Sequence, residues 1–217
     1  MRTIEWEAPA LASLAAAHWL VAYERENSPR TRNNYLAFLR SFSAFLVQHL
    51  YIKEKPTDGL VSIGKALLKK ERKVIAVDDM QRLHDWLQEN NRYFLLVCYF
   101  LHYMLIRPKE IAKLRLCDIS VSKQTVYIDD TISKNKRSAC VTIPQKIIEL
   151  MAELGYFDAP GTYYIFSKDF RPGPEWVNEK TYRDFWSRKI RPALHFPKEY
   201  KFYSLKDTGI TAMLRAG

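Results

Sequence analysis

Residues 92–116 read RYFLLVCYFLHYMLIRPKEIAKLRL, and this stretch decides how the chain folds. Residues 92–105 are apolar at nearly every position, which predicts a helix that is buried on most of its faces. The run is interrupted by His102 and is shorter than the roughly 20 residues that a membrane-spanning helix needs. Pro108 cannot continue this helix and starts a new one. We therefore expect a central core helix, a break, and a second short helix.

Short strands follow this segment along the chain. Residues 125–128 (TVYI) and 139–143 (ACVTI) alternate β-branched or aromatic residues with polar ones, which predicts two strands. They flank the polar tip 133–137 (SKNKR), so we expect an antiparallel hairpin. Helical patterns cover residues 80–87, 146–154 and 182–190. Residues 78–217 are thus predicted to form an α+β domain.

A separate helical unit precedes this domain. Ser28 and Pro29 are typical of an N-cap and a first helical position. Apolar residues then recur at helical spacing at Tyr35, Phe38, Leu39, Phe42, Phe45, Leu46 and Leu50. A shorter helical pattern covers residues 60–68, and residues 1–26 have an amphipathic pattern. Residues 1–68 are therefore predicted to be all-helical.

The predicted linker, residues 69–77, begins with the charge run KKERK. Asp78, with Gln81 three residues later, is typical of a capping box that starts the next helix. The predicted fold class is thus mainly α with a small antiparallel β-sheet.

Composition limits the class of partner. The 217 residues include 34 Lys and Arg against 24 Asp and Glu, a net charge of +10, and the pI is about 9.4. An apolar fraction of 47% argues against general disorder. Three widely spaced cysteines argue against a disulfide framework and a structural zinc site, and fit a cytoplasmic protein. The excess of positive charge favours a polyanionic partner.

Three cations stand at the ends of apolar elements, where a side chain can be held rigidly. Arg107 follows the core helix, Lys134 lies at the hairpin tip, and Lys206 follows residues 202–205 (FYSL). Arg can donate two parallel hydrogen bonds to a phosphate, and Lys supplies a point charge or a proton. Taken singly, each also fits a structural role, as a helix cap or a solvated turn residue.

The order of the three segments that contain these cations resembles the order of the sequence boxes in the tyrosine recombinase (phage integrase) family. Leu105-Ile106-Arg107, Glu110-Ile111 and Asp118-Ile119 match its first-arginine box, Gly-Leu-Arg-x-x-Glu-Leu, with Leu105 in place of the glycine. The hairpin resembles the one that carries the family's catalytic lysine, with Lys134 as the better match and Lys136 as the fallback.

Residues 203–209 (YSLKDTG) resemble the family's His-x-Leu-Arg-His-Thr box. Tyr203 stands in place of the usual His, and Lys206 in place of the second Arg. This variant is similar to integrases of Bacteroides-like mobile elements. The resemblance implies a core-binding domain at residues 1–68 and a catalytic domain at 78–217.

The resemblance also implies the reaction, in which a tyrosine attacks a DNA phosphodiester and forms a 3′-phosphotyrosyl link. Arg107 and Lys206 would bind the phosphate, and Lys134 would protonate the leaving oxygen. Tyr203 would donate a hydrogen bond to the phosphate or help to orient the nucleophile. Glu110 would support Arg107 without reacting. Candidate phosphate contacts are Arg30, Arg32, Lys136 and Arg137. For Arg30 and Arg32 the alternative is a solvated first turn of helix. The implied partner is double-stranded DNA bound by a homotetramer on paired sites, without metal, ATP or other cofactor, and without a membrane.

The family's nucleophilic tyrosine lies a few dozen residues beyond the second box, whereas this sequence ends at Gly217. We therefore expect a C-terminally truncated chain that is inactive by itself. The alternative is a non-catalytic DNA-binding protein with a recombinase fold.

Overall fold

The computed structural model describes residues 15, 18–19, 28–64 and 73–216. Contacts between backbone positions divide the chain into two units, Met1–Glu71 and Arg72–Gly217. The predicted helix at residues 1–26 lies largely outside the described residues; Ala15, His18 and Trp19 are helical.

The first unit is built on one long helix, α2 (Pro29–Gln48). Ser28 caps it, because its hydroxyl accepts a hydrogen bond from the main-chain N–H of Thr31 at 3.3 Å. Pro29 occupies the first turn, where a missing N–H costs nothing. The helix predicted from this start signal is confirmed.

The predicted helix over residues 60–68 is wrong for residues 60–64, which are not helical. The Asn33 side chain of α2 pairs with both main-chain groups of Ile63, each at 2.9 Å. Arg32 donates to the carbonyl of Val61 at 2.8 Å, and Arg40 donates to that of Leu60. These side chains satisfy backbone groups that a helix would otherwise pair internally. Residues 65–68 lie outside the described residues.

Helix α4 (Arg92–His102) is the centre of the second unit. Phe94, Leu96, Val97, Phe100 and Leu101 are fully buried, as its nearly all-apolar sequence requires. It packs against α3 (Val77–Asn90), α5 (Pro108–Ile111), α6 (Gln145–Glu153) and α9 (Ser204–Ala216). Burying each such side chain contributes about 1.5–3 kcal/mol, so this helix anchors the unit.

The core helix ends earlier than predicted. α4 stops at His102 instead of continuing to Leu105. Leu105 has a φ of +55°, in the left-handed region, and so cannot be part of the helix. The chain then turns and begins α5 at Pro108.

The segment before α3 belongs to the packing of the second unit. Ile75 is buried, and its N–H donates to the Thr208 hydroxyl of α9 at 2.9 Å. α3 begins at Val77 with Ala76 as its N-cap, and this cap has no side-chain hydrogen bond. The predicted capping box is therefore wrong, and Gln81 instead donates to Asp85 at 2.8 Å. Tertiary hydrogen bonds set this helix start.

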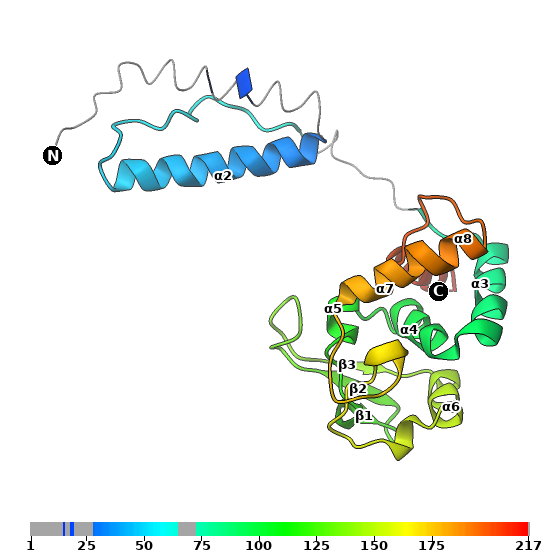
Figure 1. Cartoon of the computed structure of the whole chain (residues 1–217). Helices are drawn as coiled ribbons and strands as arrows, with labels where there is room; N and C mark the ends of the chain where they lie inside the picture. The colour runs from blue at the N-terminus through cyan, green and yellow to red at the C-terminus, as the bar shows by residue number, and fades with distance from the viewer. Residues whose placement is uncertain (1–14, 16–17, 20–27, 65–72, 217) are drawn as a thin grey trace. The chain divides into compact units, whose positions relative to one another are not determined.

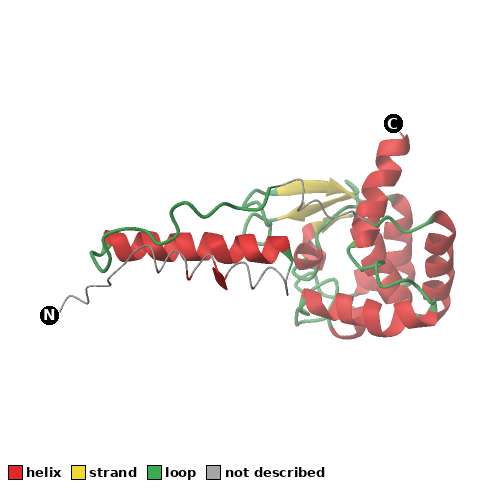
Figure 2. Cartoon of the chain, turned by 90° about the horizontal axis from the view of Figure 1, so that it is seen from above, coloured by secondary structure: helices red, strands yellow, loops and turns green. Residues whose placement is uncertain are grey.

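The three-stranded sheet has the order β1-β2-β3 and is antiparallel throughout. It contains β1 (Ile119–Ser120), β2 (Thr125–Ile128) and β3 (Ala139–Thr142). In β2, Val126 and Ile128 are buried while Tyr127 is exposed, which fits the predicted alternation. The strands lie at one edge of the second unit, and helices make up the rest (Figure 2).

Along the chain after the sheet, the second unit continues with helices. A turn of π-helix, η5 (Trp186–Ile190), links α7 (Glu179–Phe185) to α8 (Arg191–Ala193). Single-turn 3₁₀ helices are η2 (Leu116–Asp118), η3 (Tyr156–Asp158) and η4 (Lys168–Phe170).

The predicted fold class, mainly α with a small antiparallel sheet, is confirmed (Figure 1). No helix among the described residues is long and apolar enough to cross a membrane.

Gly209 lets α9 lie directly against the end of α4. A Cβ atom at this position would come within 2.0 Å of the carbonyl oxygen of His102. We expect Gly209→Ala to lower the free energy of unfolding by about 1–3 kcal/mol, because backbone must move to make room. Helix propensity alone would favour alanine by about 1 kcal/mol, so the expected sign is the opposite of the usual one.

Urea unfolding followed by circular dichroism measures this change. Gly161→Ala is the matched control in the same unit, because its Cβ would meet only ordinary contact distances, 3.6 Å at the nearest. Equal stability of Gly209→Ala and wild type would contradict the close approach.

Candidate active site

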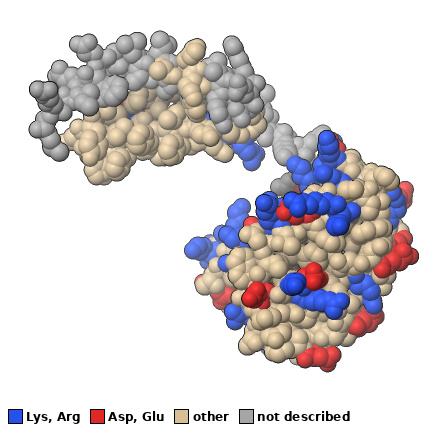
Figure 3. Space-filling model, viewed as in Figure 1, with Lys and Arg blue, Asp and Glu red and all other residues tan. Residues whose placement is uncertain are grey.

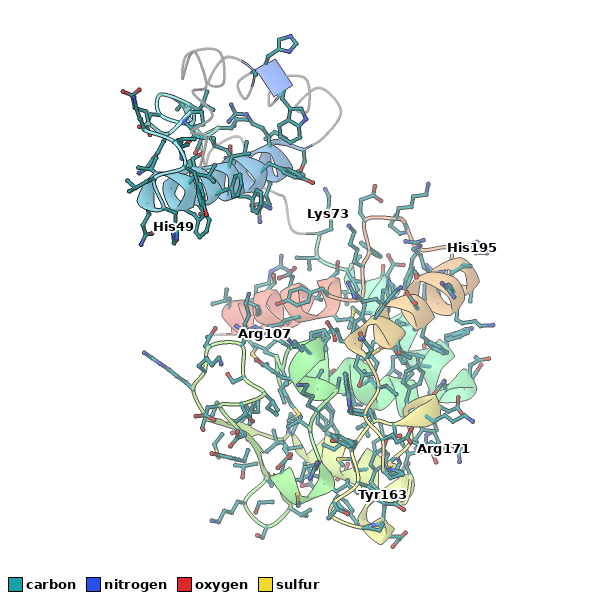
Figure 4. All side chains as sticks on the ribbon, turned by 60° about the vertical axis from the view of Figure 1, so that its left-hand side comes forward. His49, Lys73, Arg107, Tyr163, Arg171 and His195 are labelled. Atoms are coloured by element: carbon teal, nitrogen blue, oxygen red, sulfur yellow. The ribbon has the colours of Figure 1, made fainter. Side chains whose placement is uncertain are left out.

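Arg107 lies between the end of α4 and the start of α5 (Figure 4). It is the N-cap residue of α5, with Pro108 directly after it. Its guanidinium Nη1 donates to Glu110 Oε1 at 2.9 Å, and its main-chain N–H donates to Glu110 Oε2 at 2.9 Å. The side chain is 34% exposed. Glu110 thus fixes Arg107 through one of five guanidinium donors and leaves the fork open to a ligand.

Glu110 connects Arg107 to the loop between β2 and β3. Its carboxylate is 5% exposed and also accepts a hydrogen bond from the main-chain N–H of Lys134 at 3.2 Å. Burial opposes ionisation, but the hydrogen bonds from Arg107 and Lys134 outweigh it and lower the pKa of Glu110 below its ordinary value. One buried carboxylate therefore holds two cation-bearing segments together.

Lys206 reaches the same place from the first turn of α9. Its Nζ donates to the carbonyl oxygen of Leu105, two residues before Arg107. Burial, and then the positive charge of Arg107, lower the pKa of Lys206 below its ordinary value. The contact with Leu105 holds the Lys206 ammonium against the turn that leads into Arg107.

His102 and Gly209 hold α9 in place beside Arg107. His102 Nδ1 forms a hydrogen bond with the carbonyl of Leu205 at 3.1 Å, and burial lowers the pKa of the His102 imidazole. The Leu105 side chain also lies beside Gly209, 3.1 Å from where its Cβ would be. The first turn of α9 therefore has a fixed position relative to the end of α4.

The hairpin loop presents its cations differently from Arg107. The hydrogen bond between Lys134 and Glu110 comes from the Lys134 main chain, and the Lys134 side chain is exposed. Lys136, with a φ of +54°, and Arg137 are exposed on the same loop. Tyr203 lies one residue before α9 and is 43% exposed. These side chains are accessible to a ligand at the site.

Arg30 and Arg32 belong to the first unit. Arg30 is exposed at the start of α2. Arg32 donates to the carbonyl of Val61, so it has a structural role in holding residues 60–64. A phosphate contact by either arginine stays a prediction.

Positive charge gathers near the site. On the face shown in Figure 3, Lys and Arg side chains collect at the β2–β3 loop and over α7 and α8. Within the part of the chain that the structure describes, no group of three or more His, Cys, Asp and Glu side chains could hold a metal ion. The site brings together Arg107, Glu110, Lys206 and the main chain of Lys134.

Sequence reasoning missed two features of this site. The first is the hydrogen bond from the Lys134 main chain to Glu110, for which the sequence carries no signal. The second is the Leu105 carbonyl that accepts from Lys206. The sequence did carry a signal for the Leu105 contact. Leu105 stands where the family's first-arginine box has glycine, the residue that most readily adopts a positive φ.

The ionised form of Glu110 should stabilise the fold above about pH 4.3, the ordinary pKa of an unfolded Glu. Since the folded pKa is lower, this contribution is lost as the pH falls through the folded pKa. At pH 7 we expect Glu110→Gln to lower the free energy of unfolding by about 2 kcal/mol, because its amide donors would face the donors of Arg107 and Lys134.

Urea unfolding at several values of pH between 3 and 7 tests this expectation. The difference between wild type and Glu110→Gln should shrink below about pH 4, whereas the exposed Glu175→Gln control should show little difference at any pH. A difference that is independent of pH would contradict the assignment of an ionised, buried Glu110.

Comparison with protein-family models and with curated proteins gives no match. Solved structures do match. The Tn1549 transposon integrase in complex with transposon right end DNA has a TM-score of 0.74 and 13% identity, covering 94% of this chain and 73% of that one. The lambda integrase bound to DNA has a TM-score of 0.73 and 13% identity, with 94% and 72% covered. The lambda integrase tetramer bound to a Holliday junction has a TM-score of 0.72 and 13% identity, covering 92% of this chain and 58% of that one. The chain has the fold of these integrases, as the resemblance implied.

Proposed function

We propose that this chain is part of a tyrosine recombinase that cleaves and rejoins DNA strands at specific sites. The observation that carries the proposal is the hydrogen bond from Lys206 to the Leu105 carbonyl, two residues before Arg107, which brings the two cations to the end of α4 from positions about a hundred residues apart. Two neighbouring cations repel each other, and an anionic ligand between them relieves that repulsion. A DNA phosphodiester is such an anion.

The two cations would stabilise the transition state. Negative charge grows on the nonbridging phosphate oxygens when a nucleophile attacks, and cations held in advance at those oxygens lower the barrier by several kcal/mol. Arg107 is held by Glu110 and Lys206 by Leu105. Because both are fixed before the ligand arrives, little reorganisation is needed at the moment of reaction.

Lys134 and Tyr203 complete the proposed chemistry. A tyrosine oxygen attacks phosphorus and its phenolic proton passes to solvent, the bond from phosphorus to the 5′-oxygen breaks, and Lys134 gives a proton to that oxygen. Tyr203 donates a hydrogen bond to the phosphate. In this proposal the nucleophilic tyrosine lies outside residues 1–217. The bond energy is kept in the phosphotyrosyl link, so the reaction uses neither ATP nor a metal.

Duplex DNA is the proposed partner, and both units are proposed to contact it. The similarity of fold to integrases bound to DNA supports this, as does the net charge of +10. Lys136 and Arg137 on the hairpin loop, and Arg30 and Arg32 on α2, are the proposed phosphate contacts. By analogy with the lambda integrase tetramer, four copies of the complete protein would act on paired sites.

A covalent adduct between protein and DNA tests the reaction. The protein encoded by the complete gene is incubated with end-labelled duplex DNA from the mobile element that carries it, and the products are separated in SDS. An adduct that survives SDS and is removed by protease supports the proposal. Salt-sensitive binding without an adduct would favour the non-catalytic DNA-binding protein.

In the same adduct-forming protein, we expect Arg107→Ala to lower the cleavage rate by about 10²–10³-fold, because it removes a preorganised donor to the transition state. DNA binding, measured by fluorescence anisotropy, should stay largely intact. Lys109→Ala is the matched control, since Lys109 is an exposed cation on the same short helix and should cleave at nearly the wild-type rate. Unchanged cleavage by Arg107→Ala would overturn the assignment of the site.

Replacing Lys136 and Arg137 together by alanine should weaken DNA binding about equally for specific and nonspecific duplexes. The slope of log affinity against log salt should become shallower by about 1–2, because one or two phosphate contacts are lost. Lys123→Ala, in the exposed turn at the other end of β2, should leave the slope unchanged. The same slope in the double variant and wild type would contradict a phosphate contact by this loop.

A further inference from the structure

Leu105 has an unusual backbone conformation at the start of the site. Its φ is +55°, which leucine seldom adopts because Cβ then approaches the carbonyl oxygen. Leu105 lies in the turn between the end of α4 at His102 and Arg107, and the Ile106 N–H closes this turn by donating to Phe100 O at 3.4 Å. Residues held in this region persist only when surrounding structure fixes them, and they cluster at functional sites.

The carbonyl of Leu105 points at the Lys206 ammonium, which donates a hydrogen bond to it. α9 brings Lys206 to this carbonyl because Gly209, one turn later, allows backbone contact with His102. The His102 imidazole fixes the same turn by bonding Leu205 O. Three separate contacts therefore place Lys206 beside the turn at Leu105.

We propose that the left-handed conformation of Leu105 aims its main-chain carbonyl at Lys206, so that this carbonyl positions the ammonium beside Arg107 and makes lysine the cation that fits here. Leu105 is thus a positioning residue. The consequence for phosphate binding rests on the proposed function, whereas the contact itself does not.

The chemistry of lysine suits this arrangement. An ammonium has three N–H donors around one atom, so one can go to the Leu105 carbonyl while two face a ligand. The planar guanidinium of arginine is longer and presents its donors in a rigid fork. Because the lysine ammonium already contacts the Leu105 carbonyl, the longer arginine side chain would have to move away from this position to fit. Burial and the charge of Arg107 lower the pKa of Lys206, so an anion bound beside it would stabilise its ammonium form.

Nuclear magnetic resonance of the ¹⁵N-labelled 217-residue chain tests the contact. The Lys206 ammonium signal is identified by its loss in Lys206→Arg, and the exposed Lys109 serves as the reference. We expect the Lys206 ammonium protons to exchange with water about tenfold more slowly than those of Lys109, because they are hydrogen-bonded and half-buried.

Two variants of Leu105 separate the backbone from the side chain. Leu105→Gly removes the side chain but adopts a positive φ freely, so it should keep the slow exchange. Leu105→Val keeps most apolar surface, but its β-branched side chain disfavours a positive φ, so exchange should accelerate about tenfold. Slow exchange in Leu105→Val, or fast exchange in Leu105→Gly, would overturn the proposal. If Leu105→Val does not fold, Leu105→Gly still decides.

Inorganic phosphate is the probe for the functional consequence, titrated while the Lys206 signal and the Arg107 guanidinium signals are followed. Leu105→Val and Lys206→Arg should each weaken phosphate binding by about tenfold, the effect of misplacing one charge-assisted hydrogen bond. Binding by Lys206→Arg as tight as wild type would overturn the selection of lysine. If wild type shows no phosphate binding, the proposed function fails, while the exchange measurements still decide whether Leu105 positions Lys206.

Discussion

The buried carboxylate of Glu110 is the constraint on which the site depends. It accepts hydrogen bonds from the main chain and guanidinium of Arg107 and from the main chain of Lys134. A carboxylate in a low-dielectric interior is costly unless such donors surround it. The cost of leaving it unpaired therefore forces the end of α4, the start of α5 and the hairpin loop into one arrangement, and the cations follow from it.

The core of the second unit supplies the rigidity that this arrangement needs. α4 is buried on nearly every side, and the aromatic rings of Phe94, Phe170, Phe185 and Phe202 pack around its first turn. In a closely packed interior, a shift of one side chain displaces its neighbours, so such shifts are resisted. The C-terminal end of α4, where Leu105 and Arg107 follow, is therefore a fixed platform. α9 lies on it through Gly209, without a side chain between the backbones.

Lysine in place of a second arginine gives the proposed phosphate site a different character. A guanidinium fork positions itself by forming two parallel bonds with its ligand, whereas an ammonium is a point charge on a flexible stem. In this chain the flexibility is restrained by the protein, because the Leu105 carbonyl takes one donor. The neighbouring charge of Arg107 and partial burial both disfavour the ammonium, so an anionic ligand would stabilise the pair.

The sequence by itself predicted most of the helices and strands, and it singled out the candidate site residues. Apolar periodicity located α2 and α4, alternation located β2 and β3, and the order of the boxes pointed to Arg107, Lys134 and Lys206. These are local patterns, which local physics fixes. Only the tertiary structure decided where residues 60–64 and the start of α3 go, since side chains distant in sequence bond their main-chain groups. It also decided that Lys206 meets the Leu105 carbonyl, because that contact depends on the packing of α9 against α4, and no local pattern encodes a distance between segments a hundred residues apart.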